Sequence, residues 1–227
     1  MPRILYLSCF LMGLLFTMPL QAATLGDVSV PLADRSDSSV RAAEQAALAQ
    51  VLSRLTGRAD ATSLPGAASL LANPQQWLSQ FGFAASATGA QLLTASFDVK
   101  ALNKALLAAG APVWSTSRPT LLLGLAMPEG LASTQSGSIL AQAADQRGLP
   151  LLLPADGNAL NTADIRGRFM QSVFSASAGY ATDLVATAVI YAGNPASVRW
   201  WLYQKSVLLT QGQGNAADTQ AAQALLI

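Results

Sequence analysis

Hydrophobic and polar residues alternate over a short segment near the start of the globular part of the chain. Val28, Val30 and Leu32 are separated by serine and proline, which is the pattern of a strand with one buried face. The strand begins near Asp27. Pro31 within it favours the edge of a sheet, because proline has no N–H to donate to a neighbouring strand.

An apolar stripe at helical spacing follows this strand. Residues 34–38 supply side chains that cap helices, and Gly57 stands where helices often end in the left-handed conformation. The pattern predicts a helix of residues 40–55 that packs on a sheet. Its stripe consists of Val40, Ala43, Ala47, Leu48, Val51, Leu52 and Leu55, and Arg41, Arg54 and Arg58 are predicted to face away from it.

The rest of the first half predicts a small sheet with further helices. A short helix at residues 67–71 precedes two alternating segments, 79–85 and 91–99, which have the pattern of a β-hairpin. A helix at residues 100–109 follows and ends at Gly110. The order β-α-α-β-β-α indicates an α+β unit in which helices cover a small sheet.

Continuous apolar runs replace alternation in the second half. Residues 120–126, 149–153 and 184–191 are almost entirely apolar, as in strands buried on both faces. Helices predicted at residues 134–147 and 162–178 separate these runs, which indicates a mostly parallel sheet. Residues 198–209 alternate again and are predicted to form an antiparallel edge strand.

The two patterns together predict the α/β class, with two small α/β sandwich domains. Residues 24–114 form the first domain, with α+β order, and residues 118–227 form the second. The polar residues 115–117 link them. Trp114, beside this linker, is predicted to fill the contact between the domains.

The first 23 residues have the features of a cleavable signal peptide. Arg3 supplies the positive charge, an apolar stretch follows, and cleavage after Ala22 or Ala23 fits the preference for small residues. A retained membrane anchor is the alternative, but the apolar run of about 15 residues is shorter than the roughly 20 that span a bilayer. We therefore expect a periplasmic protein that is not inserted in the membrane after cleavage.

Composition excludes several classes of function. Without Arg3, basic and acidic residues are equal in number, so no excess of positive charge favours nucleic-acid binding. The chain has no histidine, and its single cysteine, Cys9, lies in the predicted leader. These facts exclude Ser-His-Asp and Cys-His catalysis and zinc sites made of His or Cys. No cofactor and no metal are predicted.

One motif matches a nucleotide-binding pattern in part. Residues 212–217, GQGNAA, fit the Gly-x-Gly-x-x-Ala fingerprint. The fingerprint also requires a further parallel strand and an acidic residue about 20 positions later, but the sequence stops at Ile227. We therefore interpret the segment as a turn, with Asn215 at the N-cap of a helix.

Carboxylates are the remaining candidates for catalysis. Asp34 with Asp37 and Asp156 with Asp164 are the nearest pairs suited to acid–base catalysis or to binding Ca²⁺, and a glycosidase needs two such groups in one cleft. All four fall in predicted loops or helix starts, where helix capping and solvation account for them. Asp98 is likewise predicted to cap the helix that follows it. No catalytic residue is assigned.

Three aromatic residues are candidates for binding a partner. Trp200, Trp201 and Tyr203 lie on the predicted edge strand, where they could hold a protein, a glycan or an added strand. Strand alternation places Trp201 and Tyr203 on one face and Trp200 on the other. The alternative is that Trp200 belongs to the core and that Trp201 packs beneath the C-terminal helix.

Several ordered motifs carry a resemblance to a known family. They are ALAQVLSRLTG at residues 47–57, LANP at 71–74, FD at 97–98, PVWS at 112–115 and RP at 118–119. In these the chain resembles the bacterial envelope family catalogued as domain of unknown function 2066. The resemblance implies an exported protein without an established activity and a further helix beyond Ile227, so that the second domain would be incomplete here.

Two functions remain after these exclusions. The favoured one is an exported, non-catalytic periplasmic protein that binds or assembles an envelope protein or polymer. The alternative is a carboxylate-dependent periplasmic hydrolase that acts on a glycan. Converging carboxylates in a pocket favour the hydrolase, and exposed aromatic residues at a sheet edge favour the binding protein.

Overall fold

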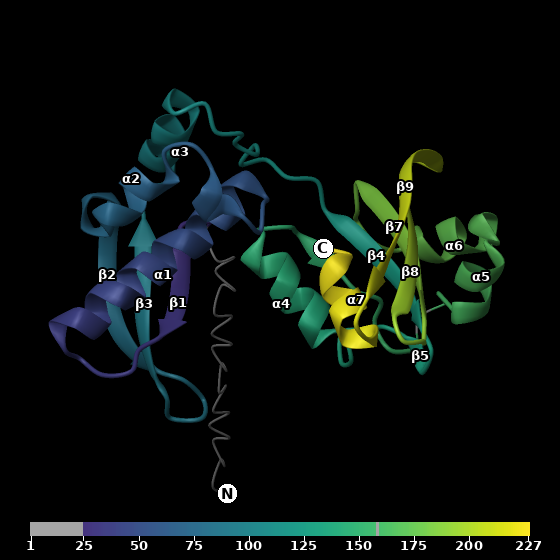
Figure 1. The fold of residues 1–227 in the computed structure, drawn as a ribbon. Coiled ribbons are helices and arrows are strands. Elements are labelled where there is room, and N and C mark those ends of the chain that lie inside the picture. The colour runs from purple at the N-terminus through teal and green to yellow at the C-terminus, as the bar shows by residue number, and fades with distance from the viewer. Residues whose placement is uncertain (1–24, 158) are drawn as a thin grey trace, which may run out of the picture.

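A computed structural model describes residues 25–157 and 159–227 as two α/β halves joined through a linker (Figure 1). The predicted leader, including Cys9, lies outside the described residues. The α/β class is confirmed, since each half packs helices against its own sheet.

The first half has the predicted order of elements. Its antiparallel sheet has the order β1-β3-β2, so β1 with Pro31 is an edge strand as predicted. The strands are β1 (Asp27–Pro31), β2 (Leu78–Ala85) and β3 (Gln91–Phe97); the helices are α1 (Asp37–Thr56), α2 (Ala67–Ala72) and α3 (Val99–Ala108), with 3-10 turns at Ala61–Ser63 and Pro74–Trp77.

Helix α1 buries the predicted apolar stripe. Ser36 caps its start by accepting a hydrogen bond from the backbone N–H of Ser39, and Gly57 ends it with a φ of 70°. Ala47, Leu48, Val51, Leu52 and Leu55 are fully buried against the sheet. Val40 is half-buried at the margin of the same core. The period of 3.6 residues therefore located this face correctly.

The prediction that Arg54 faces solvent is wrong. Arg54 is only 5% exposed, whereas Arg41 and Arg58 are exposed as predicted. The guanidinium of Arg54 is enclosed between the two halves, where it hydrogen-bonds to main-chain and carboxylate oxygens. A buried charge is tolerated only when it is paired in this way.

The second half has a mixed sheet rather than a mostly parallel one. Strand β4 pairs in parallel with β6 and β7, as predicted, but the pairs β4–β5, β7–β8 and β8–β9 are antiparallel. The strands are β4 (Leu121–Met127), β5 (Gly130–Leu131), β6 (Leu151–Leu152), β7 (Leu184–Tyr191), β8 (Ala196–Gln204) and β9 (Val207–Ala216). The larger antiparallel part arises because the chain turns back once more than predicted.

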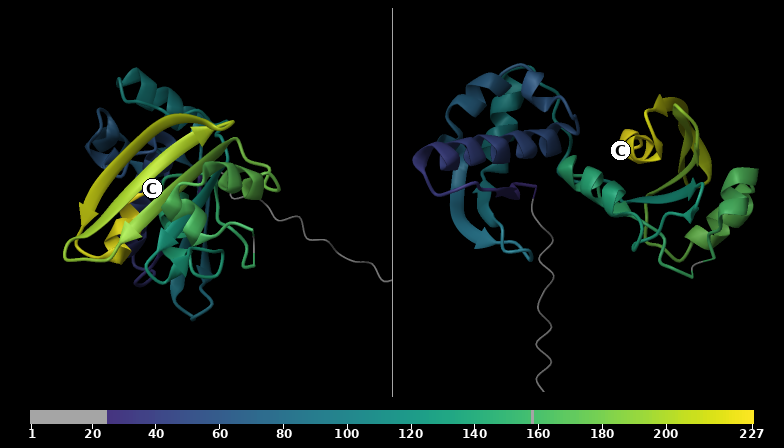
Figure 2. Two further views of the ribbon diagram at one scale, coloured as in Figure 1. Left: turned by 90° about the vertical axis from the view of Figure 1, so that its right-hand side faces the viewer. Right: turned by 60° about the horizontal axis from the view of Figure 1, so that its bottom comes forward.

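Four helices cover the second sheet, two on each face. Helices α4 (Ser138–Gln146) and α7 (Thr219–Leu225) lie on one face, and α5 (Thr162–Gly167) and α6 (Met170–Ser177) lie on the other (Figures 1 and 2). Both faces of β4 and β7 are therefore buried, which accounts for their continuous apolar sequences.

Three boundary predictions in this half are wrong. The predicted single strand 198–209 is a hairpin that turns at Lys205 and Ser206, both with positive φ, so the edge strand is β9 and not β8. Residues 212–216 belong to β9, and Asp218 rather than Asn215 caps the last helix. The predicted helix 162–178 is interrupted at Arg168, whose φ is 57°.

Buried apolar side chains form separate cores. One cluster lies in residues 28–111, and two others lie on the opposite faces of the second sheet. Within the described ranges, no such cluster takes side chains from both halves. The two predicted domains coincide with this separation, and their independence stays a prediction that unfolding experiments test.

Candidate binding sites

The three aromatic candidates do not share one exposed surface. Tyr203 is only 5% exposed, and its ring centre lies 5.3 Å from that of Phe174. Trp200 is half-buried against the core beneath α4 and α7, and Trp201 is half-buried against the core beneath α5 and α6. Burial removes Tyr203 from the residues that can contact a partner, and Trp201 is the one that borders the surface described next.

Strands β8 and β9 present a polar surface beside Trp201. Their register pairs Arg199 with Gln213 and Trp201 with Gln211, so these four side chains lie on one face. A hollow of about 420 Å³ is lined by Arg168, Arg199, Trp201, Gln211, Gly212 and Gln213. A second hollow of about 350 Å³ continues along the same strands between Ser197 and Asn215. We call these two hollows and their lining residues the β8–β9 face.

Arg168 reaches the β8–β9 face from the break between α5 and α6. The N–H of Phe169 donates to the carbonyl oxygen of Asp164 at 2.9 Å, which ends α5 with Arg168 in the left-handed conformation. The guanidinium carbon of Arg168 then lies 4.5 Å from the centre of the Trp201 ring. This cation–π contact fixes the orientation of the charged group.

The sequence reveals only part of this surface. Alternation along β8 places Arg199 and Trp201 on the same side, as predicted. The sequence did not place Gln211 and Gln213 on a strand, because the glycines around them suggested a turn. Gly212 is instead required within the strand, since a Cβ there would lie 2.6 Å from a ring atom of Trp200.

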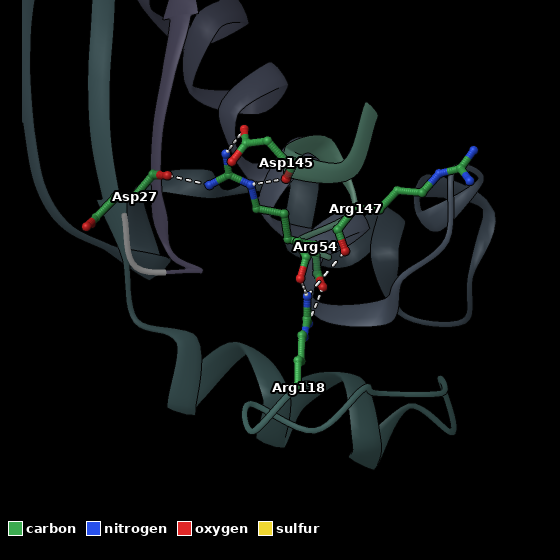
Figure 3. A network of polar contacts seen from close by, with 6 residues as sticks. Asp27, Arg54, Arg118, Asp145 and Arg147 are labelled. Carbon is green, nitrogen blue, oxygen red and sulfur yellow. Dashed lines mark hydrogen bonds and ion pairs between the residues drawn. The ribbon is translucent and has the colours of Figure 1, made fainter. Parts of the chain in front are cut away.

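A second set of polar residues joins the two halves (Figure 3). Arg54 of α1 donates from Nε to the carbonyl oxygen of Asp145 at 2.9 Å and from Nη2 to its Oδ2 at 2.6 Å. Its Nη1 donates to the carbonyl oxygen of Asp27 at the start of β1. Because α4 ends next to Asp145, Arg54 connects that helix to the first sheet.

Arg118, directly after the linker, completes this junction. Its guanidinium donates to the carbonyl oxygens of Arg54, Arg147 and Gly148, the contact with Arg147 being 3.2 Å long. Burial lowers the pKa of Arg118 from its ordinary value, because the charged form loses contact with water. We call the residues of these contacts the junction network: Asp27, Arg54, Arg118, Asp145, Arg147 and Gly148.

Trp114 lies beside the junction network. The guanidinium carbon of Arg118 is 4.4 Å from the centre of its ring, and its backbone N–H donates to the carbonyl oxygen of Leu55 at 2.8 Å. The ring also faces Gly57, where an added Cβ would lie 3.0 Å from it. Trp114 therefore packs on the end of α1 and supports Arg118, rather than filling the contact between two apolar surfaces.

A pocket of about 460 Å³ opens next to the junction network. Polar side chains contribute much of its lining: Asp27, Ser29, Gln50, Arg54, Gln80, Thr94, Ser96 and Asp145. The hydroxyl of Ser96 donates to Oδ1 of Asp27 at 2.7 Å. The pocket thus combines hydroxyls, amides and two carboxylates, Asp27 and Asp145, which the sequence alone did not associate.

Three of the five carboxylates considered from the sequence, Asp34, Asp98 and Asp164, make local hydrogen bonds. Asp34 accepts hydrogen bonds from the backbone N–H and hydroxyl of Ser36, which lower the pKa of its carboxyl. Asp164 accepts from the side chain of Asn161 at 2.7 Å. Asp98 caps α3 as predicted, through a 2.9 Å bond from the N–H of Ala101.

The described part of the chain contains neither a cluster of metal ligands nor a membrane-spanning helix. No three His, Cys, Asp or Glu side chains in residues 25–157 and 159–227 lie close enough together to hold a metal ion. Among the same residues, no helix has the length and apolar character needed to cross a bilayer.

Comparison with protein families corrects the resemblance drawn from the sequence motifs. Residues 20–115 match the family model described as Domain of unknown function (DUF8605), a different domain from domain of unknown function 2066. The similarity covers the predicted first domain, which is less than half of the chain. Comparisons with curated proteins and with solved structures gave no match.

Proposed function

We propose that this chain is an exported, non-catalytic protein of the periplasm whose second half binds an envelope protein or polymer. The export part of the proposal rests on the charged, apolar and small-residue segments of the first 23 residues. The binding part rests on the β8–β9 face, and in particular on Arg168 and Arg199.

One observation carries the choice of the β8–β9 face. In the described structure the ion pairs are Arg54–Asp145 and Arg58–Asp60, and neither Arg168 nor Arg199 takes part in one. Both arginines line a hollow in which no acidic side chain of the described residues lies. Guanidinium groups that the fold leaves unpaired beside a hollow are available to a partner.

Site-specific crosslinking in cells tests this proposal. A photo-crosslinking amino acid at Gln211, on the β8–β9 face, should give a discrete adduct with an envelope component. The same amino acid at Gln76, which is exposed in the first half, is the control. Equal adducts from both positions, or none from Gln211, would contradict binding through this face. Export is tested separately by the N-terminal residue of the periplasmic protein, expected to be Ala23 or Thr24.

The pocket at the junction favours a second candidate function, a carboxylate-dependent glycan hydrolase. Asp27 and Asp145 line it together with hydroxyl and amide groups, and glycosidases use two carboxyl groups across a glycan. The test is the release of reducing ends from cell-wall glycan by the purified protein. Activity that is lost in both Asp27→Asn and Asp145→Asn would establish the hydrolase and displace the binding proposal.

A further inference from the structure

We infer that the ligand of the β8–β9 face is an acidic glycan, with an anionic group held between Arg168 and Arg199. This inference rests on the proposed function, because it takes the β8–β9 face to be the binding surface. It goes further by naming the chemistry of the ligand and the role of each side chain.

Arg168 is held in place before any ligand arrives. Its backbone has a φ of 57°, and adjacent hydrogen bonds fix the turn: the N–H of Phe169 donates to Asp164, and the N–H of Met170 donates to Arg168 itself at 2.9 Å. Trp201 then supports the guanidinium at 4.5 Å. Trp201 is therefore a positioning residue, and Arg168 loses little side-chain freedom when an anion binds.

Arg199 faces the same hollow from the sheet. It is exposed on β8 opposite Gln213, and the pairing of Trp201 with Gln211 continues the same face toward Arg168. Two arginines line the hollow, and within residues 25–157 and 159–227 no carboxylate lines it to neutralise them. Each guanidinium can donate two parallel hydrogen bonds to a carboxylate or phosphate, which makes an anionic group the ligand that this charge favours.

The other lining groups favour a glycan over an acidic peptide. Gln211 and Gln213 each offer an amide that both donates and accepts, and Ser197 and Asn215 extend this polar lining along the strands. The hydroxyl groups along a glycan can form hydrogen bonds with such side chains at each sugar unit. A protein interface instead depends on large apolar anchors in desolvated pockets. Among the residues that the structure describes, Val198 and the half-buried Trp201 are the large apolar residues that line the two hollows.

Calorimetric titration of the purified protein with an oligogalacturonate tests the inference. A neutral gluco-oligosaccharide of the same length and an oligoglutamate are the comparison ligands. The oligogalacturonate should bind more tightly than either, and its affinity should fall as salt is added, because ions screen exposed charges. Arg168→Gln and Arg199→Gln should each weaken it about tenfold or more, the usual effect of losing a hydrogen bond to a charged group.

Arg41→Gln is the matched control, since it removes one exposed arginine from the first half and should leave the affinity unchanged. The positioning role of Trp201 has its own measurement. Trp201→Leu should weaken binding, Trp201→Phe should restore most of it, and Arg168→Gln should cost little further affinity in the Trp201→Leu protein. Circular dichroism melting of every variant separates lost binding from lost folding.

The outcomes distinguish the glycan inference from the proposed function. Absence of oligogalacturonate binding, or binding that both arginine variants retain, overturns the inference. If oligoglutamate binds in an arginine-dependent way and oligogalacturonate does not, the ligand is an acidic protein, and only the proposed function stands. If crosslinking from Gln211 also yields nothing, the proposed function fails with it.

Discussion

Arg54 and Asp145 meet across the two halves through two hydrogen bonds, one to the carbonyl oxygen of Asp145 and one to its carboxylate. The two partners are unequal in their exposure. The side chain of Arg54 is 6% exposed and that of Asp145 is 59% exposed. Removal of the arginine and removal of the carboxylate should therefore differ in their effects.

Arg54→Ala should lower the free energy of unfolding by about 2–3 kcal/mol, because it removes the buried guanidinium that donates several charge-assisted hydrogen bonds. Asp145→Ala should cost less, about 1 kcal/mol, because its carboxylate is partly solvated and Arg54 keeps its main-chain partners. Urea unfolding measures both values. Arg58→Ala breaks the exposed pair with Asp60 and should change the free energy of unfolding least, because water screens exposed ion pairs. Equal costs for Arg54→Ala and Arg58→Ala would contradict the structural role of the junction.

Leu55→Ala tests the separation of the cores. Leu55 is fully buried in the first cluster, and such a truncation typically costs about 2–5 kcal/mol. The melting temperature of the first half should fall, while that of the second half should stay unchanged. Scanning calorimetry measures both transitions. Leu107→Ala, at a position 61% exposed on α3, is the control. A single transition that shifts as a whole would refute two independent domains.

Gly148→Ala should destabilise the protein by more than backbone strain alone. Gly148 has a φ of 62°, and an added Cβ would lie 2.2 Å from Nη1 of Arg118 and 3.2 Å from Cβ of Arg54. Gly110→Ala is the matched variant, because Gly110 has a φ of 77° and no atom within 4 Å of the added Cβ. Strain at one such residue costs about 1–3 kcal/mol. Chemical denaturation should show a larger loss for Gly148→Ala, and equal losses would exclude a packing role for Arg118.

Asp34 gives a prediction about pH. Hydrogen bonds from Ser36 lower the pKa of this carboxyl below its ordinary value of 3.8. A lowered folded-state pKa contributes stability above about pH 3.8, and this contribution disappears as the pH falls through the folded-state pKa. NMR titration should place the Asp34 carboxyl below 3.8 in the native protein and closer to it in Ser36→Ala. An unchanged titration in Ser36→Ala would show that the hydroxyl is not the cause.

Sequence periodicity predicted the elements whose burial depends on residues nearby in the sequence. It failed where contacts with residues distant in the sequence determine which side chains are buried. The stripe of α1 was predictable because every buried residue recurs at helical spacing. Arg54 was not, since its burial depends on a carboxylate 91 positions away in sequence. Strand β9 was not recognised for a similar reason: Gly212 is required by the ring of Trp200, which it faces across the hairpin, and Gly214 by the side chain of Leu225 in α7.

The β8–β9 face was predictable only in the part that strand β8 contributes. Strand alternation gave the shared side of Arg199 and Trp201, because the side-chain period of a strand is two. Arg168 reaches this face only because the chain breaks between two short helices. No spacing in the sequence relates Arg168 to Trp201. A polar surface that is assembled from a loop and a hairpin leaves no continuous sequence motif.

The partners of the junction arginines have a consequence for mutational tolerance. Most of the acceptors are main-chain carbonyl oxygens, at Asp27, Arg54, Asp145, Arg147 and Gly148. A carbonyl group is present whatever side chain its residue bears, so the side chains of Asp27 and Arg147 can change without removing these acceptors. Arg54 and Arg118 have no such freedom, because a lysine has one charged nitrogen where each arginine uses at least two. Random substitution across the junction should therefore concentrate its damage at these two arginines and at Gly148, which needs its small size.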